Sequence, residues 1–171
     1  MFAESGMTFL VSSSFSKSFS LYGERVGALT IVDQSQDEST RVLSQLKRVI
    51  RANYSTPPTH GGMVVATVLN TPELRAEWES ELGEMRARIK LMRRRLVEGL
   101  AAHGARQDFS FVERQNGMFS YSGLTARQVE RLRDEFGIYA VSSGRICVAA
   151  LNSTNVDYVA GAIATVLEPV R

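Results

Sequence analysis

A single long run of periodic apolar residues constrains the fold of this chain more than any other feature of its sequence. From residue 72 to residue 102, apolar side chains recur at spacings of three and four, which places them on one face of an α-helix. Thr71-Pro72-Glu73 provides a capping side chain, a proline at the first helical position and an acid in the first turn. The apolar positions are Leu74, Trp78, Leu82, Met85, Ile89, Met92, Leu96 and Leu100. We therefore predict one long helix that organises the shorter elements around it.

The charges of this helix are ordered, with acids first and bases last, as the helix dipole favours. The bases are Arg86, Arg88, Lys90, Arg93, Arg94 and Arg95. A basic cluster of this size can bind nucleic acid, but the net charge of the chain is only +2 and no aromatic residues stand among the arginines. We interpret the bases as a solvated face and expect no nucleic-acid partner.

Composition indicates an ordinary globular protein. The chain has 171 residues, 44% of them hydrophobic, which is enough for one domain with a core. It has no run of about 18 uncharged apolar residues, and its N-terminus does not resemble a secretory leader. The single cysteine, Cys147, and the two histidines, His60 and His103, give no metal-ligand spacing. We expect a cytoplasmic protein with no membrane partner and no structural metal.

Shorter elements flank the long helix. Strands are predicted over residues 8–12 and 25–33, the second apolar on both faces, although two strands alone do not make a stable sheet. Thr125 to Gln128 fits a capping box that starts a helix. Helices are predicted at 35–53, 61–70, 126–136 and from an Asn152 cap onward, and strands at 109–113, 118–121, 138–141 and 145–149. From residue 109 onward this alternation predicts a small α+β layer packed on the long helix.

One serine-rich stretch, residues 12–27, is too apolar to be a linker. Phe15, Phe19, Leu21 and Tyr22 are interleaved with its serines, so we expect it to be packed. Lys17 lies in its middle, and a lysine amine attacks carbonyls when burial or a neighbouring cation lowers its pKa.

Ser14 and Arg25 lie on either side of Lys17 in the sequence and offer a hydroxyl and a guanidinium, which together suit a phosphate. A lysine that condenses with an aldehyde beside a phosphate-binding pair describes a pyridoxal phosphate (PLP) site. We expect the Lys17 amine to be poorly hydrated there.

The string Ser-x-Ser-Lys-x-Phe-x-Leu-Tyr-x-Glu-Arg-x-Gly, from Ser14 to Gly27, resembles the lysine segment of the aspartate and aromatic amino-acid aminotransferases, which are fold-type I PLP enzymes. Three further segments resemble the same family in the same order, and they are residues 51–61, 116–120 and 142–148. The resemblance extends over about residues 8–167. Residues 116–124 and 143–152 look closer to the aromatic (tyrosine) branch.

The resemblance implies an α/β fold, the PLP-dependent transferase (aspartate aminotransferase-like) fold, in truncated form. Residues 1–80 would be a C-terminal remnant of the large PLP-binding domain with its mixed sheet. Residues 81–171 would be the small α+β C-terminal domain, and the long helix 72–102 would bridge the two. The chain would thus be the C-terminal part of an aminotransferase.

The resemblance also implies the cofactor and its ligands. Lys17 would hold PLP as a Schiff base and move the proton from the substrate Cα, with Ser14 and Arg25 on the phosphate and Tyr22 fixing the cofactor region. The reaction would transfer an amino group between an aromatic or dicarboxylic amino acid and a 2-oxo acid.

Four more residues would bind the substrate by the same resemblance. Arg145 would grip the α-carboxylate and Phe119 would line the pocket. Arg51 and Ser55 would act across the interface of a homodimer, where Arg51 meets the distal carboxylate of the substrate.

The chain departs from the family because it begins about sixteen residues before the lysine. Family members carry upstream the aspartate that pairs with the pyridine nitrogen, further ring ligands and most of the sheet. We therefore expect the 171-residue chain alone to have little or no transaminase activity.

Two other functions stay open. Ser14-Phe15-Ser16-Lys17 also fits Ser-x-x-Lys, a pattern of serine acyl enzymes, although neither Ser-Asp-Asn nor Lys-Thr-Gly occurs in the chain. The other alternative is a non-catalytic fragment that acts only as an interaction or dimerisation module.

Overall fold

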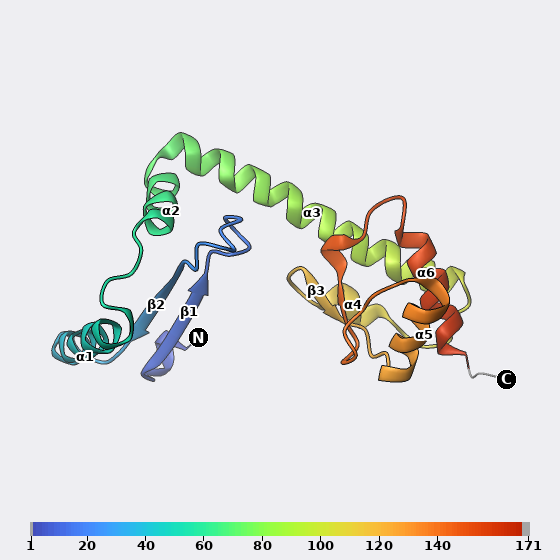
Figure 1. The fold of residues 1–171 in the computed structure, drawn as a ribbon, viewed down its shortest axis with the longest axis horizontal. Helices are drawn as coiled ribbons and strands as arrows, with labels where there is room; N and C mark the ends of the chain where they lie inside the picture. Colours follow the sequence, from blue (N-terminus) through green and yellow to red (C-terminus); the bar gives the residue numbers. More distant parts are fainter. Residues whose placement is uncertain (1, 169–171) are drawn as a thin grey trace. The chain divides into compact units, whose positions relative to one another are not determined.

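A computed structural model of the chain describes residues 2–168. The chain divides into two compact units, Met1–Leu82 and Gly83–Arg171, and the long helix passes from one to the other. Helices and strands are mixed in both units (Figure 1).

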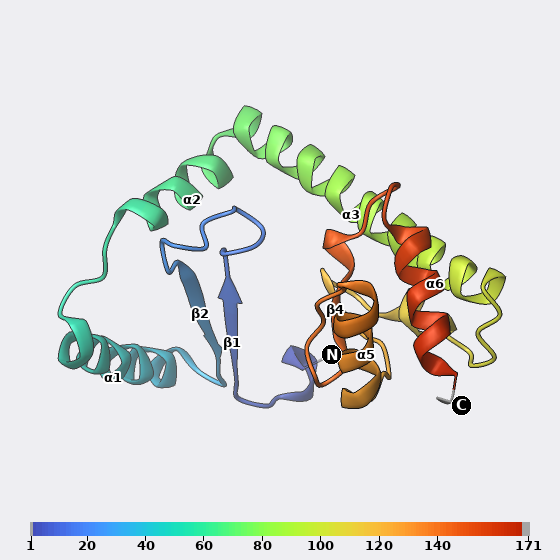
Figure 2. The same ribbon diagram turned by 45° about the vertical axis from the view of Figure 1, so that its right-hand side comes forward.

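Unit 1 is built around one strand pair. After a short 3₁₀ turn, Ala3–Ser5, strand β1 (Phe9–Ser14) pairs antiparallel with β2 (Gly27–Val32), in a register that runs from Phe9↔Val32 to Ser14↔Gly27. Figure 2 shows the two strands side by side, with an irregular loop joining their upper ends. Both predicted strands are therefore confirmed, with ends shifted by a few residues.

Three helices complete unit 1. They are α1 (Gln36–Tyr54), α2 (His60–Asn70) and the first part of α3 (Pro72–Ala102). Helix α1 starts where the Ser35 hydroxyl accepts a 3.2 Å hydrogen bond from the Glu38 amide, which satisfies one free donor of the first turn. All three helices begin within a residue of the predicted positions.

Unit 1 has little core of its own. Every residue of α1 is at least partly exposed, and the buried residues of α2 are Gly61 and Val65. The expectation that the second strand is buried on both faces is wrong, because β2 is exposed from Gly27 to Thr30. Since β1 and β2 form a two-stranded sheet, their side chains lack the second layer that a buried strand requires.

Unit 2 contains the hydrophobic core. The second half of α3 packs against α5 (Ala126–Phe136) and α6 (Val156–Leu167) through the buried residues Leu96, Leu132 and Ile163. Helices α3 and α6 approach closely, since a methyl group added to Gly99 would lie 2.8 Å from the Ala160 methyl. The unit also contains α4 (Ser110–Arg114), β3 (Phe119–Tyr121), β4 (Arg145–Cys147) and the 3₁₀ turn Val148–Ala150.

Several predictions for unit 2 are wrong. Residues 110–114 form α4 rather than a strand, so the Asn116-Gly117 turn joins a helix to β3, and β3 pairs with β4. Residues 138–141 have no regular structure. The last helix begins at Val156, although the Asn152 carboxamide oxygen still accepts hydrogen bonds from the Thr154 and Asn155 amides just before it.

The sequence analysis predicted that the basic residues of α3 form a solvated face. This prediction is wrong for two of them. Arg93 is buried, with 2% of its surface exposed. Arg88 donates hydrogen bonds of 2.7 and 2.8 Å to the carbonyls of Leu151 and Ala149. These two side chains form hydrogen bonds with other segments of unit 2 instead of extending into solvent.

No helix among residues 2–168 is long and apolar enough to cross a membrane. Over the same residues, histidine, cysteine and acidic side chains form no group of three that could hold a metal ion.

Candidate active site

The Lys17 loop, residues 15–26, is closed at its base by the strand pair. Ser14 and Gly27 are the last paired residues, and the Phe15 amide donates a 3.1 Å hydrogen bond to the Val26 carbonyl. A side chain at position 27 would not fit, because a Cβ there would lie 2.7 Å from the Ser13 carbonyl oxygen. The glycine therefore permits the close strand approach that brings the two ends of the loop together.

Within this loop the predicted cofactor residues converge on Tyr22. Lys17 Nζ lies 4.2 Å from the centroid of the Tyr22 ring, and the guanidinium carbon of Arg25 lies 5.9 Å from it. Arg25 also donates a 2.9 Å hydrogen bond from Nη1 to the Tyr22 carbonyl. An amine and a guanidinium eight positions apart in the sequence are thus gathered around one aromatic ring.

The backbone is strained at two places in unit 1 that carry predicted site residues. Arg25 has φ of 54° and Ser55 has φ of 65°, values in the left-handed region that side chains other than glycine rarely adopt. Such strain collects at functional sites, where it costs about 1–3 kcal/mol per residue.

The expected poor hydration of Lys17 is not observed. The side chains of Lys17, Tyr22 and Arg25 are all exposed in the structure. Phe15, Phe19 and Leu21 are half-buried, as are Ser16 and Ser18, so the loop is packed although the lysine is not covered. The prediction of a desolvated amine is therefore wrong for these 171 residues by themselves, because the two-stranded sheet provides no layer that covers the lysine.

Ser14 is held at the start of the loop. Its hydroxyl donates a 3.1 Å hydrogen bond to the Ser16 hydroxyl and accepts a 3.3 Å hydrogen bond from the Ser16 amide. Ser14 therefore lies at the base of the Lys17 loop, where its hydroxyl is hydrogen-bonded to Ser16.

Arg51 and Ser55 lie together at the C-terminal end of α1. The Ser55 amide donates a 3.2 Å hydrogen bond to the Arg51 carbonyl, and Ser55 is the residue that ends the helix. Arg51 is exposed and lines an open groove of about 800 Å³ on α1 together with Lys47 and Arg48. This groove offers three cations to an anionic group.

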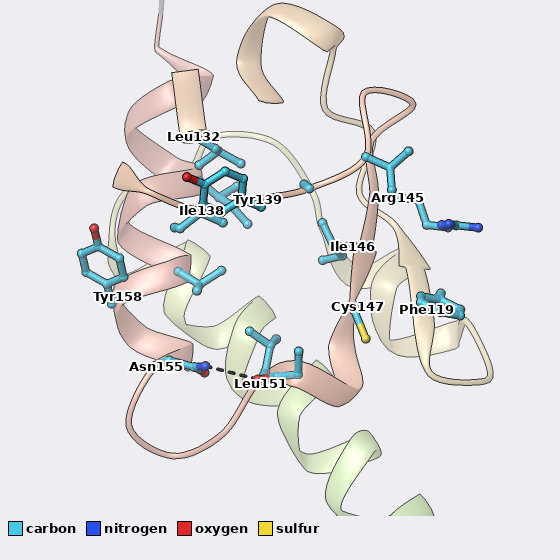
Figure 3. A pocket seen from close by; sticks show the side chains of 15 residues that line it. Phe119, Leu132, Ile138, Tyr139, Arg145, Ile146, Cys147, Leu151, Asn155 and Tyr158 are labelled. Carbon is cyan, nitrogen blue, oxygen red and sulfur yellow. Dashed lines mark hydrogen bonds between the residues drawn. The ribbon is translucent and has the colours of Figure 1, made fainter. Parts of the chain in front are cut away.

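Arg145 and Phe119 lie on the neighbouring strands β4 and β3 of unit 2. The guanidinium carbon of Arg145 lies 4.9 Å from the centroid of the Phe119 ring. Both line the rim of a cavity of about 510 Å³ whose other walls include Ile138, Tyr139 and Tyr158. Figure 3 shows Arg145 and Phe119 on the same side of this cavity, with Tyr139 and Tyr158 on the opposite side.

The structure thus forms three groups of predicted site residues. Lys17, Tyr22 and Arg25 belong to the loop of unit 1, with Ser14 at its base as the last residue of β1. Arg51 and Ser55 lie at the C-terminal end of α1, and Arg145 and Phe119 belong to the strand pair of unit 2.

The sequence analysis missed two residues that support these groups. Arg93 binds the backbone beside Phe119, and Trp78 binds the backbone beside Lys17. A signal was available for Arg93, which stands four positions after Ile89 and three before Leu96 and therefore on the apolar face of α3. Trp78 was assigned to the apolar stripe, and nothing in the spacing indicated a contact 60 positions away.

The chemistry of the Lys17 loop suits the two reactive ends of PLP. A primary amine fits the aldehyde, and an arginine with a serine hydroxyl fits the phosphate. The amine and the arginine lie in this loop, and Ser14 lies at its base as the last residue of β1, in a chain of mixed helices and strands. These residues therefore point to the class of proteins that bind PLP.

Comparison with known proteins identifies the family. The family described as "Aminotransferase class I and II" matches residues 1–163, and the chain belongs to this family. It is 73% identical over 167 residues to an aspartate aminotransferase of Pseudomonas aeruginosa, and 52% identical over 165 residues to an aromatic-amino-acid aminotransferase of Escherichia coli. These matches cover 98% and 96% of this chain.

The same likeness holds for solved structures. The crystal structure of an aromatic-amino-acid aminotransferase from Burkholderia pseudomallei, covalently bound to pyridoxal phosphate, matches 98% of this chain with a TM-score of 0.92 and 69% identity. This chain covers 42% of that chain and 42% of each of the two relatives above. It therefore spans less than half the length of the proteins it matches.

Proposed function

We propose that this chain carries the lysine segment and the substrate-carboxylate segment of a PLP-dependent amino-acid transaminase. The observation that carries the proposal is the convergence of Lys17 Nζ and the Arg25 guanidinium on the Tyr22 ring, 4.2 and 5.9 Å from its centroid. The reaction is the transfer of an amino group between an aromatic or dicarboxylic amino acid and a 2-oxo acid. Family membership supports this reaction class.

In this proposal each residue of the loop has a separate task. Lys17 would hold PLP at its aldehyde carbon, and its amine, once the substrate amine has displaced it from that carbon, would move the proton that leaves the substrate Cα. Arg25 and Ser14 would hold the phosphate, and Tyr22, which contacts both cations, would help to fix the cofactor region. PLP, when bound, supplies the electron sink that stabilises negative charge on the substrate Cα.

The substrate is held at its two ends. Arg145 binds the α-carboxylate through two parallel hydrogen bonds, a geometry that lysine does not reproduce, and Phe119 beside it contacts the substrate side chain. Arg51 and Ser55 act across the interface of a homodimer, where Arg51 reaches the site of the other subunit and binds a distal carboxylate. Fixing both ends orients the Cα–H bond for removal of its proton.

We further infer that residues 1–80 are a remnant of the large PLP-binding domain and residues 81–171 the small C-terminal domain, in a truncated aspartate aminotransferase-like fold. Substrate preference within the family is proposed to include both classes. The aspartate aminotransferase of Pseudomonas aeruginosa and the aromatic-amino-acid aminotransferase of Burkholderia pseudomallei are 73% and 69% identical to this chain, so identity favours neither. The aromatic branch stays a prediction.

The proposal predicts that activity requires more than these residues. More than half of each relative's length lies outside the match, and the cofactor loop here is exposed. The test is to mix the chain with a polypeptide that holds the unmatched part of the Pseudomonas aeruginosa relative. Transamination should appear in the mixture and be lost with Lys17→Ala. A mixture that forms the complex but keeps its activity with Lys17→Ala would refute the proposal.

A second function, a non-catalytic interaction module, is favoured by one observation. Apolar side chains of unit 1 are exposed on both the strand pair and α1, and they include Leu10, Leu29, Leu43 and Val49, all at least 48% exposed. Exposed apolar surface of this kind marks an interaction face. This function is supported if the complex forms and no reconstituted mixture shows any cofactor uptake.

A further inference from the structure

Trp78 of helix α3 makes two contacts with the loop that carries Lys17. Its indole Nε1–H donates a 2.7 Å hydrogen bond to the carbonyl of Ser18, the residue directly after Lys17. Its ring stacks on Phe19, with centroids 4.6 Å apart and an angle of 23° between the planes. All of these residues belong to unit 1, and the hydrogen bond spans 60 positions of the sequence.

The stack continues into the loop on the other side of the lysine. Phe19 meets Phe15 edge to face, with centroids 5.5 Å apart, and the Phe19 amide donates a 3.1 Å hydrogen bond to the Phe15 carbonyl. Lys17 is midway between these two phenylalanines. Aromatic rings therefore pack together at both ends of the turn that contains Lys17, and Trp78 links these rings to helix α3.

The loop needs such a support. It has no regular secondary structure between β1 and β2, and it contains two residues with left-handed backbone, Ser20 with φ of 55° and Arg25 with φ of 54°. Conformations of this kind persist only when surrounding contacts determine them. Because the Lys17 side chain itself is exposed, its position depends on how the backbone on either side is held.

We propose that Trp78 is a positioning residue for Lys17. The indole fixes the Ser18 carbonyl and the Phe19 ring, and thereby holds the Lys17 amine beside Tyr22 and Arg25. The importance of that position rests on the proposed function of Lys17, while the support that Trp78 gives to the loop is a property of the chain alone.

Two variants separate the contacts of Trp78. Trp78→Phe keeps an aromatic ring that can stack and removes the N–H donor, whereas Trp78→Leu removes both. Val65→Ala is the matched control, because Val65 is a buried residue of α2 in the same unit and has none of the contacts described for the indole.

The first readout is hydrogen exchange of the Phe19 amide, measured by NMR in the 171-residue chain. Loss of one hydrogen bond should speed its exchange roughly three- to ten-fold in Trp78→Phe, and more in Trp78→Leu. The α6 amides of unit 2 serve as the internal reference and should not change. Equal exchange of the Phe19 amide in the wild type and in both variants would overturn the proposal.

The second readout is the distribution of label among the three lysines of the chain, Lys17, Lys47 and Lys90, after incubation with PLP, borohydride reduction and peptide mapping. The share of label on Lys17 should fall in Trp78→Phe and stay at the wild-type value in Val65→Ala. A Trp78→Phe chain that labels Lys17 as selectively as the wild type would refute the positioning role and leave the proposed function intact. Even labelling in the wild type would instead refute the proposed function, and hydrogen exchange would still decide the role of Trp78.

Discussion

Arg93 reaches from helix α3 to the backbone of Phe119, where its Nη2 donates a 2.9 Å hydrogen bond to the Phe119 carbonyl. The same guanidinium binds the Gly117 and Val112 carbonyls at 2.8 Å and the Ser120 hydroxyl at 2.7 Å. Burial lowers the pKa of Arg93 from its ordinary value, yet four oxygen acceptors solvate the charge in place of water. Strand β3, which presents Phe119 to Arg145, is therefore fastened to the core of unit 2.

We predict that Arg93→Met destabilises unit 2 by about 2–4 kcal/mol, because it leaves several oxygen acceptors without donors. The free energy of opening can be measured by hydrogen exchange of the α6 amides. Arg94→Met is the matched control, since Arg94 is the next residue and is exposed, and its effect should stay within about 0.5 kcal/mol. Equal effects of the two substitutions would contradict the structural role assigned to Arg93.

The turn before Arg145 depends on Gly144. Its φ is 82°, and a Cβ at this position would lie 2.7 Å from the Leu124 carbonyl oxygen. Gly144→Ala is therefore expected to destabilise unit 2 by about 2–4 kcal/mol, since both backbone strain and a clash with main-chain atoms arise.

Gly137→Ala serves as the comparison for Gly144→Ala. Gly137 ends α5 with φ of 66°, but a Cβ there has no heavy atom within 4 Å outside its chain neighbours. Only the backbone strain remains, so we expect a loss of about 1 kcal/mol. Thermal unfolding of the two variants would measure the difference, and a larger loss for Gly137→Ala would show that the predicted clash at Gly144 does not occur.

The carboxyl group of Asp108 has a depressed pKa. The largest cause is its hydrogen bond from the Ser110 backbone N–H, at 2.8 Å, followed by the bond from the Ser110 hydroxyl at 2.9 Å. We predict that Ser110→Ala raises the pKa of Asp108 part of the way to the ordinary value of about 3.9, because the backbone donor remains. An NMR titration of the side-chain carboxyl carbon measures this value.

The sign of the pH effect follows from the lowered pKa of Asp108. The folded state favours the ionised carboxylate, so the stability that it contributes is fully present above the unfolded-state pKa and is lost as pH falls through the folded-state value. Ser110→Ala should weaken this dependence on acid, and Ser110→Thr, which keeps a hydroxyl, should preserve it. Identical titrations of Asp108 in the wild type and in Ser110→Ala would contradict the assigned cause.

Local signals predicted most helices of this fold. Helix α5 has the predicted bounds, because the Thr125 hydroxyl accepts a hydrogen bond from the Gln128 amide and the Gln128 side-chain oxygen accepts one from the Thr125 amide, as a capping box requires. Helix α3 likewise starts at Pro72 and ends at Ala102, as the periodic apolar residues indicated. These elements are specified by contacts between residues a few positions apart.

The strand predictions in unit 2 failed where a short apolar pattern fits two structures. Phe109 and Val112 are both buried and three positions apart, as in a helical turn. The alternating pattern of residues 109–113 had suggested a strand instead. Asp108 favours the helix over the strand, since its carboxylate accepts a hydrogen bond from the Ser110 amide at the start of α4.

The candidate site was only partly predictable. Individual residues such as Lys17 and Arg145 were proposed through the family resemblance and stay predictions, since isolated lysines and arginines have no distinctive spacing. Burial of Lys17 was predicted and is wrong here, because burial depends on surrounding layers that a sequence window does not describe. The buried state of Arg93 depends in the same way on acceptors 19 to 27 positions away.

The most direct test of the central claim is to identify which lysine of this chain holds PLP. The chain is incubated with PLP, reduced with borohydride and digested, and the label on Lys17, Lys47 and Lys90 is quantified by mass spectrometry. The account predicts that Lys17 carries most of the label, and that Arg25→Ala, which removes the proposed phosphate ligand, reduces this preference. Equal labelling of the three lysines, or a preference for Lys47 or Lys90, would contradict it.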